Sequence, residues 1–309
     1  MKFIIKFVKR KILIILIIIM FLLLLTVCNK MKEKVKDKVK EHFNENSPRD
    51  KSFKLVDYED KKDKVYVKLN DVMVNEPAIY RNDLLNIKKF TNLSSSSVVL
   101  DAGCGTGRGI TEIINLFPGI HVEGIDMSRN MINQSRINNP GANLLCTSLV
   151  NSNIYKKNSL SHILCMRMTL NENPTGTISK ILENFHKWLK NDGYLILNIT
   201  DPNKLDPGQR AFSQYYKSDN NVKHALTYFE GFTHDAWWEK VKNKKNWYQY
   251  CEKIMFSNKN FIIKTTQVWI PSVNKMLEYI TRHNYKIKEI IEIDEFNRDD
   301  YSMYIFEKK

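Results

Sequence analysis

Residues 98–109 read VVLDAGCGTGRG, an apolar stretch that ends in a glycine-rich loop and leads into a helical pattern. Glycine lets the backbone pass close under a ligand and adopt dihedral angles that are closed to other residues. The dinucleotide-binding pattern GxGxxG is nearly present, but Arg108 stands where its third glycine would fall. The loop instead has the form GxGxG behind the acidic residue Asp101. The segment therefore predicts a buried strand, a ligand-binding loop and a helix.

Around this segment, short β-type runs alternate with amphipathic helical runs, which is typical of a mainly parallel sheet with helices on both faces. We expect seven strands, at residues 97–101, 121–125, 143–146, 162–166, 194–199, 285–293 and 301–307, the last two forming an antiparallel pair at the sheet edge. The expected helices are 76–90, 109–117, 129–138, 175–190 and 272–283. Residues 201–271 form an aromatic-rich insertion after the fifth strand, and their alternation predicts two or three antiparallel strands.

The glycine loop resembles the first motif of the class I S-adenosylmethionine (SAM)-dependent methyltransferases, which implies a Rossmann-like fold and SAM as cofactor. In that family the counterpart of Asp101 positions the amino-acid end of the cofactor. The residues expected to pass under it are Gly103, Cys104, Gly105 and Gly107. The stretch GIDMS at residues 124–128 is similar to the family's acidic second motif. The resemblance implies that Asp126 binds both ribose hydroxyls and that Met127 packs on adenine.

The third cofactor position departs from the family pattern. After the third strand the family commonly has an Asp that contacts the adenine amino group, whereas this chain has Thr147, Ser148 and Leu149. A hydroxyl can accept the same hydrogen bond without the assistance of a charge. We therefore expect Ser148 and Leu149 at the adenine.

The sequence identifies no catalytic residue. Methyl transfer is an in-line displacement that depends mainly on positioning, so a recognisable acid or base is not required. The Asn-Pro-Pro-aromatic signature of amino-group methyltransferases is replaced by MRMTLN at residues 166–171. His162 falls inside an expected strand, which favours a core position. The five cysteines contain no CxxC pair, so we expect no metal site and a reducing compartment.

The N-terminus carries a membrane signal, because residues 12–27 are apolar except for Thr26 and basic residues stand on both sides. Residues 12–28 would rise roughly 25 Å as a helix, the short end of the range that spans a bilayer. A cleaved signal peptide is the alternative, although the apolar run is long and an AxA site is absent. The sequence thus divides into an anchor at 1–29, a charged stalk or linker at 30–64 and a methyltransferase domain at 65–309, with 201–271 as a substrate cap.

The net charge of +14 is typical of proteins that bind nucleic acid, but the distribution of the charge along the chain argues against such a partner. Residues 1–64 hold 17 Lys and Arg against 9 Asp and Glu, so the remaining chain is only mildly basic. We expect a single-pass membrane protein with a cytosolic domain that methylates a small-molecule or lipid-like acceptor. A protein or nucleic-acid methyltransferase and a non-catalytic SAM-binding scaffold are the alternatives.

Overall fold

The computed structural model describes residues 61–73, 77–209, 215–219, 221–258, 260–292 and 301–309. The chain divides into a unit at residues 1–56, which lies outside the described residues, and a compact unit at residues 57–309. The expected anchor at residues 12–28 and most of the stalk are therefore outside the described part. Helix α2 begins at Lys61, so it crosses the expected domain boundary at residue 65.

The larger sheet has seven strands within the described residues, as the sequence predicted, in the order β11-β12-β5-β4-β1-β2-β3. Its strands are β1 (Val98–Ala102), β2 (His121–Asp126), β3 (Asn143–Cys146), β4 (Leu160–Cys165), β5 (Leu189–Thr200), β11 (Tyr285–Glu292) and β12 (Tyr301–Lys308). Strands β1 to β5 are parallel to one another, and β12 runs antiparallel to both β5 and β11. The prediction of a Rossmann-like sheet with an antiparallel edge pair is confirmed.

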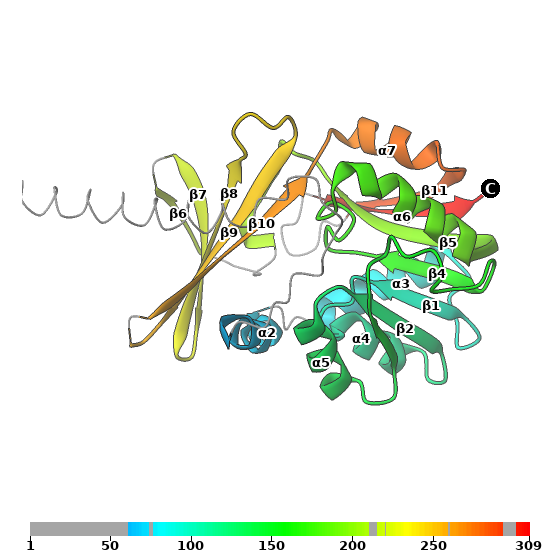
Figure 1. Cartoon of the computed structure of the whole chain (residues 1–309), viewed down its shortest axis with the longest axis horizontal. Helices are drawn as coiled ribbons and strands as arrows, with labels where there is room; N and C mark the ends of the chain where they lie inside the picture. The colour runs from blue at the N-terminus through cyan, green and yellow to red at the C-terminus, as the bar shows by residue number, and fades with distance from the viewer. Residues whose placement is uncertain (1–60, 74–76, 210–214, 220, 259, 293–300) are drawn as a thin grey trace, which may run out of the picture. The chain divides into compact units, whose positions relative to one another are not determined.

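Helices cover both faces of this sheet (Figure 1). They are α3 (Pro77–Phe90), α4 (Arg108–Leu116) and α5 (Arg129–Asn138) on one face, and α6 (Thr175–Trp188) and α7 (Val273–Thr281) on the other. Strand β1 is buried from Val99 to Ala102, which explains its continuous apolar run. In α4, Ile110 and Ile113 recur at helical spacing and face the sheet. The Ser128 side chain caps α5 by accepting from the Met131 N–H.

The insertion forms a second sheet of five antiparallel strands, so the expectation of two or three strands was wrong. The strands are β6 (Tyr215–Asp219), β7 (Val222–Phe229), β8 (Phe232–Lys240), β9 (Trp247–Phe256) and β10 (Phe261–Trp269), after the short 3₁₀ helix η1 (Pro207–Gln209). Left-handed residues make the tight turns, namely Asn221, Gly231, Asn243 and Asn246. Most of these residues are Asn, whose short polar side chain tolerates this conformation. Turns made by Asn are harder to recognise in a sequence than turns made by Gly or Pro.

Helix α2 (Lys61–Met73) connects the two sheets through its contacts. Its buried Tyr66 and Met73 pack against Phe232 and Ile254 of the five-stranded sheet. From the same helix, the Asp71 carbonyl accepts a hydrogen bond from Arg108 of α4 at 3.0 Å. A cavity between the two sheets is therefore closed on one side by α2.

Candidate functional site

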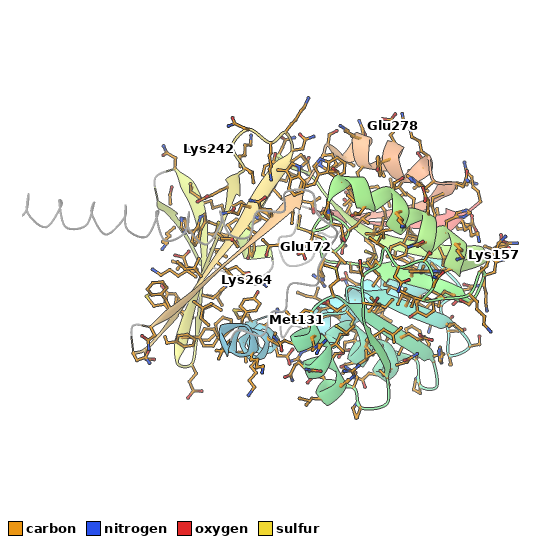
Figure 2. All side chains as sticks on the ribbon, in the orientation of Figure 1. Met131, Lys157, Glu172, Lys242, Lys264 and Glu278 are labelled. Carbon is orange, nitrogen blue, oxygen red and sulfur yellow. The ribbon has the colours of Figure 1, made fainter. Side chains whose placement is uncertain are left out.

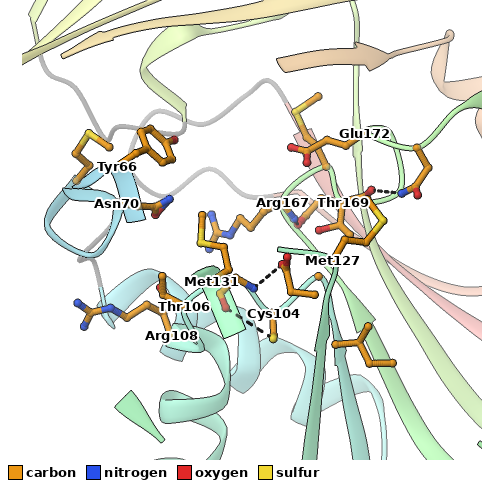
Figure 3. Close-up of a pocket in the computed structure, with 18 of the residues that line it drawn as sticks. Tyr66, Asn70, Cys104, Thr106, Arg108, Met127, Met131, Arg167, Thr169 and Glu172 are labelled. Carbon is orange, nitrogen blue, oxygen red and sulfur yellow. Dashed lines mark hydrogen bonds between the residues drawn. The ribbon is translucent and has the colours of Figure 1, made fainter. Parts of the chain in front are cut away.

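The order of the larger sheet reverses at β1, whose neighbours are β2 on one side and β4 on the other. In open α/β sheets, ligands bind at such a reversal, beyond the carboxyl ends of the strands. A cavity of about 310 Å³ lies there (Figure 3). This volume is in the range of small-molecule sites.

The glycine loop forms the floor of the cavity. Gly103 and Gly105 have φ of 82° and 53°, and both line the cavity. The Gly103 and Cys104 N–H groups donate to the Ile125 carbonyl at 2.7 and 2.9 Å, which fixes the loop to β2. A Cβ on Gly105 would meet no atom within 4 Å, so this glycine leaves space for a ligand.

Gly107 serves packing rather than the cavity. Its φ is 83° and it caps α4, but a Cβ there would lie 2.3 Å from the Ser135 hydroxyl and 2.5 Å from the Asn139 amide nitrogen. Gly107 does not line the cavity. It therefore allows α4 and α5 to approach each other.

Asp126, at the end of β2, lines the cavity with a carboxylate that is already oriented. Its Oδ2 accepts from the Gly105 N–H at 3.0 Å, and its Oδ1 accepts from the Ser128 N–H at 2.8 Å. Each carboxylate oxygen has a second lone pair, so both can accept one more hydrogen bond. Burial raises the pKa of Asp126, the two backbone hydrogen bonds oppose this, and the charges of Glu172 and Lys264 act in opposite directions. Figure 2 shows Glu172 and Lys264 in the region between the two sheets.

Asp101 lies below the loop, not in the main cavity. It lines a smaller adjoining cavity together with Tyr80 and Gly109. Burial, followed by the negative charge of Asp126, raises the pKa of Asp101 to about 7. Burial likewise raises the pKa of the Cys104 thiol well above its ordinary value, so Cys104 contributes a neutral thiol to the cavity wall.

An apolar surface beside Asp126 is formed by four residues. These are Ile125, Met127, Met131 and Leu149. Met127 is 39% exposed, which leaves its side chain available to a flat ligand. Thr147 lines the cavity as well, whereas Ser148 does not, and the Ser148 hydroxyl accepts from the Val150 N–H at 3.3 Å. Of the three expected adenine contacts, Met127 and Leu149 line the cavity and Ser148 does not.

The loop after β4 lines the opposite wall and is strained. Arg167 and Met168 both have positive φ, 56° and 66°, which is costly for residues with a side chain. The Arg167 N–H donates to Asn198 Oδ1 at 2.9 Å, and its guanidinium forms an ion pair with Asp83 at 3.0 Å. These two contacts hold the turn so that Thr169 and Glu172 line the cavity.

Sequence reasoning missed the residues that the insertion and α2 contribute. They are Tyr66 and Asn70 from α2, and His234, Glu252 and Lys264 from three strands of the five-stranded sheet. The Tyr66 hydroxyl donates to Glu252 Oε2 at 3.1 Å, and His234 Nε2 lies 3.1 Å from Glu252 Oε1. Lys264 Nζ lies 3.8 Å from the centre of the Tyr66 ring. No motif marks these residues, because they meet only when the strands pair.

The residues present fit SAM. The open space over Gly105 suits a ligand that crosses the loop, the oriented Asp126 carboxylate suits a ribose diol, and the exposed Met127 suits an adenine ring. Across the described ranges, no group of three His, Cys, Asp or Glu side chains could hold a metal ion. The helices in that part of the chain are too short or too polar to cross a membrane.

Comparison with known proteins agrees with this geometry. Residues 93–254 match the family model of the methyltransferase domain. Over 56 residues the chain is 39% identical to phosphoethanolamine N-methyltransferase 2 of Caenorhabditis elegans, a match that covers 18% of this chain and 13% of that relative.

Solved structures share the fold at low sequence identity. DesVI of Streptomyces venezuelae has a TM-score of 0.61 at 16% identity, covering 82% of this chain and all of that one. SAM-bound CalS10, an amino pentose methyltransferase from Micromonospora echinaspora, has a TM-score of 0.58 at 15% identity, covering 84% and 99%. The family match covers more than half of the chain, and the fold and the cofactor loop agree with it. The chain therefore belongs to the class I SAM-dependent methyltransferases.

Proposed function

We propose that the protein transfers a methyl group from SAM to a nitrogen or oxygen atom of a small polar acceptor bound in the cavity. The observation that carries this proposal is a pair of buried polar groups at the end of β5. Asn198 Nδ2 and Thr200 Oγ1 have no hydrogen-bond partner among the described residues, and both residues line the same cavity as the glycine loop. Buried polar groups are normally paired, so these two are suited to a polar ligand.

In this proposal Asp126 binds the ribose, the segment from Gly103 to Gly105 passes under the methionine part, and Met127 and Leu149 contact the adenine. Asp101, below the loop, positions the cationic amino-acid end of SAM. When bound, SAM supplies a methyl group on a positively charged sulfur. The protein's own residues hold the acceptor in line with that methyl group and exclude water, which accounts for most of the catalysis in such displacements.

The charges in the cavity favour a small polar acceptor over a lipid chain. Arg167, Glu172, Glu252 and Lys264 all line the cavity, and an acyl chain would leave such groups desolvated. The similar proteins described above point the same way, because they include methyltransferases of phosphoethanolamine and of an amino pentose. A small polar amine is thus the preferred acceptor class.

We further propose that residues 12–28 anchor the protein in a membrane with the enzymatic domain on the cytosolic side. The apolar run supports the anchor. Basic residues flank it on both sides and do not decide the orientation, so the cytosolic side is proposed because SAM is made there. An anchored chain stays with the membrane pellet after alkaline carbonate washing, and a variant lacking residues 1–29 does not. Protease protection of the domain inside sealed cells or vesicles of known orientation distinguishes the two sides.

Methyl transfer from radioactive SAM tests the activity. The full-length chain is incubated with phosphoethanolamine, D-glucosamine, a peptide mixture, an RNA mixture and extracted membrane lipids. The proposal expects label in a small amine, and none with the Asp126→Ala variant, which calorimetry should show to have lost SAM binding. Label confined to peptide or RNA overturns the small-acceptor proposal, and tight SAM binding without any label favours the scaffold alternative.

A further inference from the structure

His234 occupies a site in the cavity that the roles given above do not use. It lies in β8, its side chain is 2% exposed, and it lines the cavity together with Gly105, Asp126 and Thr169. Its Nε2 is paired with Glu252, but its Nδ1 is buried and has no hydrogen-bond partner among the described residues. A buried imidazole nitrogen that lacks a partner, in a side chain that lines a cavity, is suited to a ligand.

The hydrogen bonds around Glu252 determine which nitrogen of His234 carries the proton. The Tyr66 hydroxyl donates to both oxygens of Glu252, at 3.1 and 3.3 Å. An ionised carboxylate only accepts, so the neutral imidazole must donate its Nε2–H to Glu252. Nδ1 then has a free lone pair directed away from Glu252. This is the arrangement in which a carboxylate orients a histidine that acts as a base.

The sheet itself holds this pair in place. Residue 234 is opposite Ile254 and residue 252 is opposite Ala236, so His234 and Glu252 are diagonal neighbours on the inner face of adjacent strands. Ile254 and Phe232 bury the same face against Tyr66 of α2. The imidazole is therefore fixed by backbone pairing, packing and two consecutive hydrogen bonds.

We propose that His234 is the catalytic base that removes the proton from the acceptor, with Glu252 and Tyr66 as positioning residues. This inference rests on the proposed function and narrows the acceptor to compounds whose N–H or O–H must ionise before attack. The acceptor's proton passes to His234 Nδ1, which frees the lone pair on the acceptor atom that then forms the new bond to the methyl carbon. The sulfur–methyl bond breaks with its electron pair on sulfur, which becomes a neutral thioether.

Two substitutions of the same kind separate this role from a structural one. His234→Gln keeps an N–H donor for Glu252 but has no basic nitrogen. His224→Gln is the matched control, because His224 lies in the next strand, is bonded to Asp235 at 2.8 Å and does not line the cavity. With phosphoethanolamine and D-glucosamine as probes, we expect His234→Gln to lower kcat about 100-fold or more. KM and SAM affinity should change by less than about 3-fold.

Nitrogen NMR of the histidine side chains tests the same inference without any acceptor. In the full-length chain at about pH 7.5, His234 should carry its proton on Nε2, and Glu252→Gln should disturb that state. A proton on Nδ1, or a kcat for His234→Gln equal to that of His224→Gln, would overturn the role. The SAM titration and the wild-type labelling assay report on the proposed function separately, so a failure of one is not mistaken for a failure of the other.

Discussion

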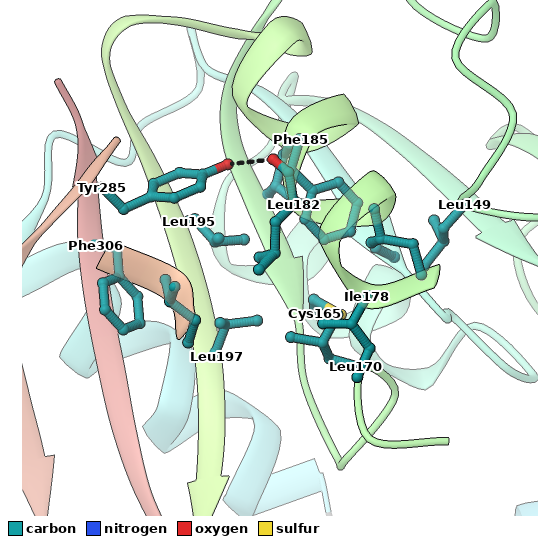
Figure 4. Close-up of a cluster of buried hydrophobic side chains, with 14 of the residues drawn as sticks. Leu149, Cys165, Leu170, Ile178, Leu182, Phe185, Leu195, Leu197, Tyr285 and Phe306 are labelled. Atoms are coloured by element: carbon teal, nitrogen blue, oxygen red, sulfur yellow. Dashed lines mark hydrogen bonds between the residues drawn. The ribbon is translucent and has the colours of Figure 1, made fainter. Parts of the chain in front are cut away.

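The two sheets of this protein contain similar residues but differ in what covers them. Behind the seven-stranded sheet, Leu195 and Leu197 of β5 pack against Leu182 and Phe185 of α6 in a closed apolar cluster (Figure 4). The other face of that sheet is closed in the same way by α3, α4 and α5. The five-stranded sheet has two small apolar clusters among the described residues, one with α2 and one between Val268 and Met168, and its outer face leaves Phe261 51% exposed.

Because of this difference, the larger sheet contributes mainly to the stability of the fold and the smaller sheet mainly to the chemistry of the cavity. The larger sheet buries most of the apolar surface, and burial is the dominant favourable term in folding. The smaller sheet places polar side chains such as His234, Glu252 and Lys264 in the cavity, where they add little to the core. Substitutions in the first sheet should therefore change mainly the free energy of unfolding, and substitutions in the second mainly turnover.

The largest effect is expected from a pair of tryptophan exchanges, one at the end of α6 in the core against the larger sheet and one in the smaller sheet. Trp188 is fully buried, with its ring 5.2 Å from Tyr155 and 5.9 Å from Phe185. Trp188→Ala should lower the free energy of unfolding by about 4 kcal/mol through lost burial and a new cavity. Trp237→Ala, on the outer face of β8 where the indole stacks on His224, should cost about 1 kcal/mol. Urea denaturation followed by circular dichroism measures both, and equal losses would remove the contrast between the sheets.

A second test uses acid. Burial lowers the pKa of His162 in β4 from 6.5 to about 4. Between these values His162 binds a proton in the unfolded chain but not in the native chain. The contribution of neutral His162 to the free energy of unfolding is therefore fully present above pH 6.5 and is lost as the pH falls toward 4. His162 should contribute about 3 kcal/mol of this loss. A His162→Gln variant should show a correspondingly flatter dependence of unfolding free energy on pH, and an unchanged slope would contradict the buried neutral state.

The next test compares two left-handed glycines. Gly103 has φ of 82° and a Cβ there would lie 2.3 Å from Thr169, whereas Gly231 has φ of 85° with open space around it. Alanine costs about 1 kcal/mol or more at either position because of its conformation. Gly103→Ala should cost about 2 kcal/mol more through the clash, and it should also weaken SAM binding. Thermal denaturation and calorimetric SAM titration of both variants check this, and similar values for the two would show that Thr169 gives way easily.

The sequence predicted most of the larger sheet because its signals are local. An apolar run, a glycine loop and a helical pattern each lie within a few residues, and β1, β2 and β3 follow them. Strand β5 begins at Leu189 rather than at residue 194, since a register shift against β4 admits the left-handed Asp192. The five-stranded sheet was underestimated because several of its turns depend on Asn rather than on Gly or Pro.

The candidate site was predicted only where it depends on one strand and the loop after it. Gly105 lies in the loop after β1 and Asp126 is the last residue of β2, so each belongs to a short sequence motif. Asn198, His234 and Glu252 reach the cavity through pairing between distant strands, and each alone resembles an ordinary sheet residue. Ser148 is the opposite case. It stands at a position where the family motif expects a cofactor contact, but its hydroxyl accepts a hydrogen bond from a nearby backbone N–H instead.

The smallest effect is expected on the outer face of the five-stranded sheet. Phe261 and Met255 are opposite each other in β10 and β9, and both are largely exposed. Phe261→Ser and Met255→Ser should change the free energy of unfolding by less than about 0.5 kcal/mol each, because little surface is removed from burial. Neither should alter SAM affinity or methyl transfer. A loss of more than about 1 kcal/mol in urea denaturation would show that this face is covered in solution, and the contrast between the two sheets would then be smaller than their burial indicates.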